Sequence, residues 1–202
     1  MRENERPLHI DPLKLAFDFD GVIADTMALF IDIARYDFNI YHIAYSDITE
    51  YRLEDCLPLP PGLIELILTR LKIGDYRFPL NPTPGAVGFL NKFIDAGKPV
   101  LLVTARHFPG PLTCFLKEHL GSGADNVQVV ATGSFNKKIS VLKEHGITFF
   151  VEDRLDTCML LKESGITPIL YKQPWNRNGH ASFDILEISN LEALTEYVRF
   201  TG

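Results

Sequence analysis

The sequence contains few cysteines and no surplus of positive charge. Cys56, Cys114 and Cys158 lie far apart in the 202 residues, and no two of them form a CxxC pair. Thiols with this spacing do not indicate a zinc site or a disulfide framework, so we interpret them as reduced core thiols. The formal net charge is −6. An acidic chain lacks the basic surface that a nucleic-acid polymer or an anionic membrane requires, although a small anionic substrate stays compatible with it.

Long hydrophobic runs are absent as well. No apolar stretch reaches the roughly 20 residues that a membrane-spanning helix needs. The first seven residues include Arg2, Glu3, Glu5 and Arg6 and have no apolar region typical of a secretory signal. We also find no repeat and no low-complexity tract. We therefore expect a cytoplasmic protein with no membrane partner, and the sequence leaves a homodimer open.

Short apolar runs alternate with helical patterns along most of the chain. The runs that predict buried strands are residues 14–19, 99–103, 127–131, 148–151 and 167–171. Helical spacing separates them, and a last helix is predicted from Leu191, Leu194 and Val198 after Asn190. Because strands alternate with helices, the sequence predicts an α/β fold, a parallel sheet with helices on both faces.

One stretch, residues 25–80, interrupts this alternation. It contains no strand pattern, but it has helical patterns in residues 26–35 and again after Pro60 and Pro61. The proline-rich residues 81–84 follow as a hinge-like connection. We therefore predict a small helical cap over residues 25–80, inserted into a core domain made of residues 1–24 and 81–202.

Polar residues stand where the predicted strands end. They are Asp18 and Asp20 after the first strand, Thr104 after the second, Glu152 and Asp153 after the fourth, and Lys137 and Lys138 in the helix before the fourth. The carboxyl ends of parallel strands meet at one edge of a sheet, so these side chains are expected to lie close together. Grouped carboxylates repel one another unless a cation joins them, and such hard oxygen ligands suit Mg²⁺.

The order of these residues resembles the four motifs of the haloacid dehalogenase (HAD) superfamily. Residues 18–26, Asp-Phe-Asp-Gly-Val-Ile-Ala-Asp-Thr, resemble its first motif, and residues 103–106, Val-Thr-Ala-Arg, resemble its second. Lys138 resembles the third motif and residues 151–154 resemble the fourth, so the resemblance covers residues 15–171. It implies a HAD-like (Rossmannoid) sheet with a cap that is inserted after the first strand and selects the substrate.

The resemblance implies a Mg²⁺-dependent phosphohydrolase that acts on a small phosphorylated substrate. Asp18 would attack phosphorus and form an aspartyl-phosphate. Asp20 would protonate the leaving oxygen and then deprotonate the water that hydrolyses the intermediate. Mg²⁺ would be bound by Asp18, by the backbone carbonyl of Asp20 and by Asp153. The second aspartate points to phosphoryl chemistry, because a halide leaving group needs no proton.

The same resemblance assigns the groups that would hold the phosphoryl oxygens. These are Thr104 with Ala105, and the ammonium group of Lys138. Lys137 is the alternative lysine, and Lys138 is favoured because it keeps the family's register relative to Gly146.

The fourth motif departs from the common pair of aspartates. It reads Glu152-Asp153, and the longer Glu152 would reach the metal through water as an outer ligand. Asp156 is a second candidate for this outer shell. Arg106, just after Thr104, is a candidate for contact with phosphate or substrate at the edge of the site.

A narrower resemblance concerns the substrate. Residues 152–154 followed by residues 171–177, Tyr-Lys-Gln-Pro-Trp-Asn-Arg, look like the 5'(3')-deoxyribonucleotidase group and its bacterial relatives. This resemblance implies a nucleoside (deoxy)monophosphate as substrate. Cap aromatics that could stack on a base are Phe30, Tyr36, Tyr41, Tyr45 and Tyr51. Trp175 is interpreted as a packing anchor for its loop.

Other classes of function stay open. The substrate could be a sugar phosphate or another metabolite. A phosphomutase would share the first motif, but it must exclude water, which a small cap disfavours. A phosphate-accepting signalling domain carries its acceptor aspartate on a middle strand, whereas the run 127–131 ends in Thr132 and Gly133. The presence of Asp18 and Asp20 argues against a non-catalytic phosphate-binding protein.

Overall fold

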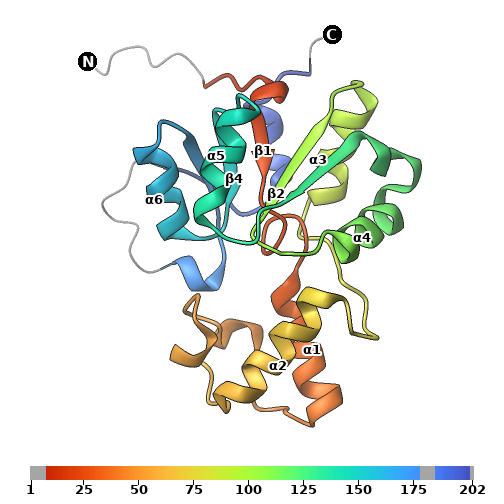
Figure 1. Ribbon diagram of the computed structural model, residues 1–202, viewed down its shortest axis with the longest axis vertical. Coiled ribbons are helices and arrows are strands. Elements are labelled where there is room, and N and C mark those ends of the chain that lie inside the picture. The colour runs from red at the N-terminus through yellow and green to blue at the C-terminus, as the bar shows by residue number, and fades with distance from the viewer. Residues whose placement is uncertain (1–7, 178–184, 201–202) are drawn as a thin grey trace.

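The computed structural model describes residues 8–177 and 185–200, and its strands form a parallel sheet (Figure 1). The charged residues 1–7, in which no secretory signal was expected, lie outside the described residues. The strands are β1 (Leu15–Phe17), β2 (Val100–Thr104), β3 (Val127–Ala131), β4 (Phe149–Glu152), β5 (Thr167–Tyr171) and β6 (Leu186–Ile188). Their order across the sheet is β3-β2-β1-β4-β5-β6.

The first strand lies in the middle of the sheet. Ala16 of β1 is in register with Leu101 of β2 on one side and with Phe150 of β4 on the other. The chain moves outward in both directions from β1, so the crevice at the carboxyl ends of β1, β2 and β4 is where this topology places a ligand. The five predicted strands are confirmed. β6 was missed because its three residues, Leu-Glu-Ile, form no apolar run.

The helices begin and end where local signals predict. They are α1 (Thr26–Phe38), α2 (Pro61–Ile73), α3 (Ala86–Asp95), α4 (Gly110–Leu120), α5 (Asn136–Glu144) and α6 (Leu155–Glu163). The Asp25 side chain caps α1 by accepting a hydrogen bond from the Ala28 amide. α2 begins at Pro61 and ends at Gly74, whose φ of 81° is the left-handed conformation that favours glycine.

The prediction of a last α-helix was wrong. The segment forms a 3₁₀ helix, η6 (Leu191–Glu196), which Asn190 caps by accepting a hydrogen bond from the Glu192 amide. Leu191 and Leu194 are both fully buried. A spacing of three residues places side chains on one face of a 3₁₀ helix as well as an α-helix, so periodicity alone could not separate the two.

Helices cover both faces of the sheet, as predicted (Figure 1). Side chains of a strand alternate between faces, so Phe17 and Ala16 point in opposite directions. Phe17 packs edge-to-face on Phe89 and Phe93 of α3 and belongs to a core that also includes residues of α4 and η6. Ala16 belongs to a second cluster, formed with residues of α5 and α6. Two apolar layers therefore fix the sheet, and its polar strand ends lie at their rim.

Residues 25–80 leave and return to the sheet at one place. Figure 1 shows α1 and α2 packed together, away from the sheet. The Asp25 amide donates to the Asn81 carbonyl at 2.8 Å, and Ala24 and Pro82 form an antiparallel bridge. The two connections therefore run side by side. The division into a cap over 25–80 and a core domain stays a prediction.

The cysteines and the helix lengths bear on two further predictions. All three cysteines are free, but only Cys158 is buried, and Cys114 is exposed. The interpretation of all three as core thiols was therefore wrong for Cys114, which lies on an exposed position of α4. Within the described part of the chain, no helix combines the length and the apolar character needed to cross a membrane.

Candidate active site

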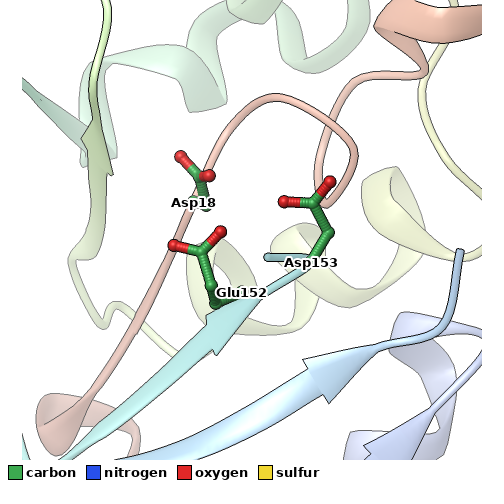
Figure 2. Close-up of side chains that lie close together, drawn as sticks. All are labelled: Asp18, Glu152 and Asp153. Carbon is green, nitrogen blue, oxygen red and sulfur yellow. The ribbon is translucent and has the colours of Figure 1, made fainter. Parts of the chain in front are cut away.

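Three carboxylates converge at the carboxyl ends of β1 and β4 (Figure 2). They belong to Asp18, Glu152 and Asp153, and each offers an oxygen that lies within 4.8 Å of the others. All three residues are buried, with exposed fractions of 5%, 0% and 5%. Asp18 follows β1 directly, and its amide donates to the Val151 carbonyl of β4 at 2.9 Å. The parallel pairing of two neighbouring strands therefore brings these acids together.

Lys138, in the first turn of α5, enters this cluster from the other side. Its Nζ lies 2.8 Å from Asp18 Oδ2 and 2.9 Å from Glu152 Oε2. Its side chain is completely buried, whereas the neighbouring Lys137 is exposed. Of the two lysines that the sequence left open, the structure places Lys138 in the cluster.

Burial dominates the electrostatics of the cluster. It raises the pKa of Asp18 well above its ordinary value, against the opposing effect of Lys138. Burial likewise raises the pKa of Glu152, and burial together with the nearby Asp18 raises the pKa of Asp153 to about 7. Burial alone would lower the pKa of Lys138, but Asp18 and Glu152 outweigh it and raise that pKa. The three carboxyl groups and the Lys138 ammonium therefore need opposite charges close by in order to stay ionised.

The cluster fits a divalent cation. Three ionised carboxylates and one ammonium leave a formal charge of −2, from −3 and +1. Clustered carboxylate oxygens are hard ligands of the kind that Mg²⁺ prefers. Gly21 keeps the space beside Asp153 open, because a Cβ at this position would clash with the Asp153 carboxylate. Asp18, Asp153 and Glu152 are the residues whose side chains could hold the ion.

Two residues after β5 orient Asp153. Trp175 Nε1 donates to Asp153 Oδ2 at 2.9 Å, and Asn176 Nδ2 donates to the Asp153 backbone carbonyl at 2.7 Å. Hydrogen bonds of this kind from an outer layer fix the direction of a metal-binding carboxylate. Trp175 had been interpreted only as a packing anchor. The Pro-Trp-Asn segment was visible in the sequence, but its contact with Asp153 depends on the tertiary fold.

Asp20 does not join the acidic cluster. Both oxygens of its carboxylate accept hydrogen bonds from Arg106, from Nη2 at 2.6 Å and from Nε at 2.9 Å. Arg106 is buried, whereas the Asp20 side chain retains 35% exposure. The sequence had placed Arg106 at the substrate edge of the site. The structure gives it Asp20 as its partner.

Thr104 and Ala105 lie beside Asp18 on the floor of the cavity described below. Thr104 ends β2 and is buried, and its Oγ1 accepts a hydrogen bond from the Arg106 amide at 3.2 Å. The Thr104 carbonyl accepts hydrogen bonds from the amide and the hydroxyl of Thr132. These bonds anchor the turn after β2, so that Thr104 and Ala105 line the cavity.

Glu152 and Asp156, the two candidates for an outer metal shell, have different surroundings. Glu152 lies inside the cluster, where its Oε2 accepts from Lys138 and its Oε1 accepts from the Arg154 amide at 3.2 Å. Asp156 is not among the acids that the structure brings together. Its carboxylate is 63% exposed and pairs with Arg154 at 2.5 and 2.6 Å. This pairing lowers the pKa of Asp156 despite partial burial.

A cavity of about 560 Å³ opens above the cluster. Its floor includes Asp18, Thr104 and Asp153. The cap side of its wall is mixed: Met27, Ile48, Leu53, Leu68 and Leu71 are apolar, whereas Glu50, Arg52, Glu54 and Lys72 are charged. A polar floor beneath such a wall suits a ligand with an anionic end and a larger body that carries both apolar and polar groups.

The five cap aromatics considered for base stacking have different positions. Tyr51 lines the cavity, together with Phe135 and Trp175 from the core. The remaining cap aromatics do not line this cavity: Phe30 is fully buried, Tyr36 and Tyr41 are 52% and 64% exposed, and Tyr45 donates its hydroxyl hydrogen to Gln173. Phe135 was not considered from the sequence, because its position depends on how α5 packs.

Comparison with known proteins identifies the fold. No protein-family model and no curated protein sequence matches the chain. Solved structures do match: a HAD-superfamily hydrolase from Ehrlichia chaffeensis has a TM-score of 0.51 at 16% identity, covering 91% of this chain and 94% of that one. CbbY from Rhodobacter sphaeroides, in complex with phosphate, has a TM-score of 0.56 at 16% identity, covering 89% and 95%. A predicted phosphoglycolate phosphatase from Haemophilus somnus has a TM-score of 0.59 at 13% identity, covering 90% and 96%. The chain therefore has the fold of the HAD-superfamily hydrolases.

Proposed function

We propose that this protein is a Mg²⁺-dependent phosphatase of small phosphate monoesters, with Asp18 as nucleophile. The observation that carries the proposal is the buried cluster of Asp18, Lys138, Glu152 and Asp153, of which Asp18 and Asp153 line an accessible cavity. Burying three carboxylates costs stability unless cations offset their charge. A cluster of this kind, open to a cavity, is typical of a site of chemistry rather than of a structural core.

Asp18 is oriented for attack on phosphorus. Its Oδ1 accepts a hydrogen bond from the Phe19 amide at 2.8 Å, and its Oδ2 faces the Lys138 ammonium at 2.8 Å. In the first step, an Asp18 oxygen bonds to phosphorus, the bond to the leaving oxygen breaks, and Asp20 supplies the proton to that oxygen. In the second step, a water attacks the same phosphorus, Asp20 takes its proton, and inorganic phosphate leaves Asp18.

The remaining residues bind charge. Lys138 and the Thr104 hydroxyl would hold phosphoryl oxygens, and the half-buried Ala105, which lines the cavity, would lie against them. When bound by Asp18 and Asp153, Mg²⁺ supplies positive charge that offsets the repulsion between carboxylate and phosphate. Glu152 keeps Lys138 in position by accepting from its ammonium at 2.9 Å.

The finer proposal is that the substrate is a nucleoside (deoxy)monophosphate. The cavity of about 560 Å³ leaves room for a base and a sugar above the phosphate. Tyr51, Phe135 and Trp175 supply aromatic surface along its walls, and stacking on such surface contributes about 1 to 3 kcal/mol per base. The Pro-Trp-Asn segment supports the same substrate class through the resemblance described above.

A sugar phosphate or another metabolite is the second candidate. It is favoured by the likeness to CbbY, one structure of which is in complex with xylulose-(1,5)bisphosphate, with a TM-score of 0.56. A phosphoglucomutase-like protein from Bacteroides vulgatus has the same TM-score of 0.56, which keeps a mutase among the alternatives. The aromatic surface of Tyr51, Phe135 and Trp175 in the cavity favours a base over either of them.

The test is phosphate release across a panel of substrates in the presence of Mg²⁺. The panel contains nucleoside monophosphates, sugar mono- and bisphosphates and phosphoglycolate. Asp18→Asn should abolish release, whereas Asp95→Asn, the same change at the exposed last residue of α3, should not alter it. A preference for nucleoside monophosphates supports the finer proposal, and release from other phosphates alone would contradict it. Release by Asp18→Asn equal to the wild type would contradict the phosphatase mechanism.

A further inference from the structure

Arg106 connects the cap to Asp20. Its Nη1 donates to the Leu71 carbonyl near the end of α2 at 3.0 Å, while Nε and Nη2 both donate to the Asp20 carboxylate. The side chain is only 5% exposed, and its guanidinium lies over the Phe19 ring at 5.5 Å from the centroid. Arg106 is therefore held by hydrogen bonds from three of its nitrogens and by the Phe19 ring.

Arg106 is the only side chain, within the described part of the protein, that we find hydrogen-bonded to the Asp20 carboxylate. The Asp20 side chain is 35% exposed and lines the cavity. A forked pair of hydrogen bonds fixes both the position and the plane of a carboxylate. Because a carboxyl group has about four positions for hydrogen bonds, the fork leaves positions on both oxygens, one of which can carry the proton given to a substrate oxygen or accept a proton from a water.

We propose that Arg106 is the positioning residue for Asp20, and that its anchor on the cap makes the orientation of Asp20 depend on where α2 sits. This inference rests on the proposed function, in which Asp20 exchanges protons with the leaving oxygen and with water. Proton transfer requires the carboxylate within hydrogen-bonding reach of the reacting atoms. Arg106 supplies this placement from the core and the cap together, without contacting the reacting atoms.

A lysine could not replace the arginine fully. The guanidinium is planar and presents donors in a fixed fork, so that it can hold both Asp20 oxygens and the Leu71 carbonyl at once. A lysine ammonium is a single point of contact and would lose the fixed plane of the carboxylate. Arg106→Lys should therefore keep the charge but retain only part of the rate.

The experiment compares two leaving groups in Arg106→Met, Arg106→Lys, Asp20→Asn and the double variant Asp20→Asn/Arg106→Met. A nucleoside 5'-monophosphate or, if it is not cleaved, the best substrate of the panel releases an alcohol that needs a proton. The aryl ester p-nitrophenyl phosphate releases a phenolate that does not. We measure the rate of the first turnover with each substrate, along with kcat and KM.

The expected result is a loss that depends on the leaving group. Arg106→Met should lower the first-turnover rate about 10- to 100-fold with the alkyl ester, as general acid catalysis contributes about 10²- to 10⁴-fold. The loss with the aryl ester should be below about 3-fold. KM should change less than kcat, Arg106→Lys should be intermediate, and the double variant should be no slower than Asp20→Asn within about 3-fold.

Three outcomes would overturn the inference. They are an equal loss with both esters, a double variant whose losses multiply, and an Arg106→Lys variant equal to the wild type. If circular dichroism shows that Arg106→Met does not fold, the first-turnover rates of Arg106→Lys with the alkyl and the aryl ester test the inference instead. The proposed function itself would fail by a different result, namely an Asp18→Asn variant that still releases phosphate. If Asp18→Asn and Asp20→Asn are both impaired while Arg106 fails these tests, only the inference is wrong.

Discussion

The floor and the walls of the cavity are built on different physical principles. Asp18 lines the floor, and ion pairs of 2.8 and 2.9 Å join Lys138 to Asp18 and to Glu152, all three of which are buried. On the cap side, the wall combines apolar side chains with the charged Glu50, Arg52, Glu54 and Lys72, and Tyr51 retains 43% exposure. We therefore expect substitutions at the floor to cause large losses of activity or stability, and substitutions in the wall to cause smaller ones. We infer that the core sets the reaction and the cap sets the choice of substrate.

The contacts between cap and core also differ from those on the floor. The Tyr51 ring lies against Arg154 at 4.3 Å, and its centroid lies 6.0 Å from that of Phe135. The Tyr45 hydroxyl donates to Gln173 at 2.9 Å, and Gln173 donates to the Gly21 carbonyl at 2.7 Å. These contacts are few and separate, and their cap members Tyr51 and Tyr45 are not fully buried, unlike the ion-paired residues of the cluster. Such contacts can break one at a time.

The largest effect on stability is expected from Lys138→Met. This change removes the only ammonium in the acidic cluster and leaves Asp18 and Glu152 buried without it. Breaking a buried ion pair on one side costs about 3 to 5 kcal/mol of unfolding free energy, which urea denaturation in the presence of EDTA measures. Lys137→Met, the same change at the exposed neighbour, should leave stability unaltered. Equal stability of the two variants would contradict the role given to the floor.

Magnesium is expected to stabilise the wild type. An ion that binds only the folded state, at a concentration of 100 times its Kd, contributes about 2.7 kcal/mol, which corresponds to a rise in Tm of about 5 to 10 °C for a chain of this size. Differential scanning calorimetry with Mg²⁺ and with EDTA measures this shift. Asp153→Asn should abolish the shift, and Asp156→Asn, whose carboxylate pairs with Arg154 outside the cluster, should retain it. A shift that persists in Asp153→Asn would remove Asp153 from the metal site.

The smallest effect is expected on the cap wall. Tyr51→Ala should raise KM for a nucleoside monophosphate about 10-fold, since it removes one stacking surface worth about 1 to 3 kcal/mol. It should leave kcat nearly unchanged, because Tyr51 does not contact the reacting atoms. Tyr51→Phe keeps the ring and should behave as the wild type. Tyr41→Ala, at a cap tyrosine that is 64% exposed and outside the cavity, is the matched control. Equal KM values for Tyr51→Ala and Tyr41→Ala would contradict a substrate-selecting wall.

The sequence predicted those features that depend on neighbouring residues. Asp18 and Asp153 follow apolar strands, so the strand order alone places them at one edge. The five strands that lie in apolar runs and the helices on both faces followed from the sequence pattern in the same way. The three-residue β6 and the 3₁₀ helix after Asn190 carry too little periodicity to be distinguished.

Contacts between distant segments could not be predicted. Arg106 and Asp20 are 86 positions apart, and Trp175 and Asp153 are 22 apart, with no sequence spacing that joins them. Tyr51 differs from Tyr41 only in the direction it faces once the cap has folded. In each case the residue type was visible, and the partner became known only with the tertiary structure.

The central claim is that Asp18 carries the phosphoryl group during turnover. The most direct measurement is acid quenching of the protein with a ³²P-labelled substrate and Mg²⁺, followed by treatment with hydroxylamine, which cleaves acyl phosphates. We predict label on the protein that hydroxylamine removes, that Asp95→Asn retains and that Asp18→Asn lacks. Substrate turnover by the wild type without any label on the protein, or label that persists in Asp18→Asn, would contradict the claim.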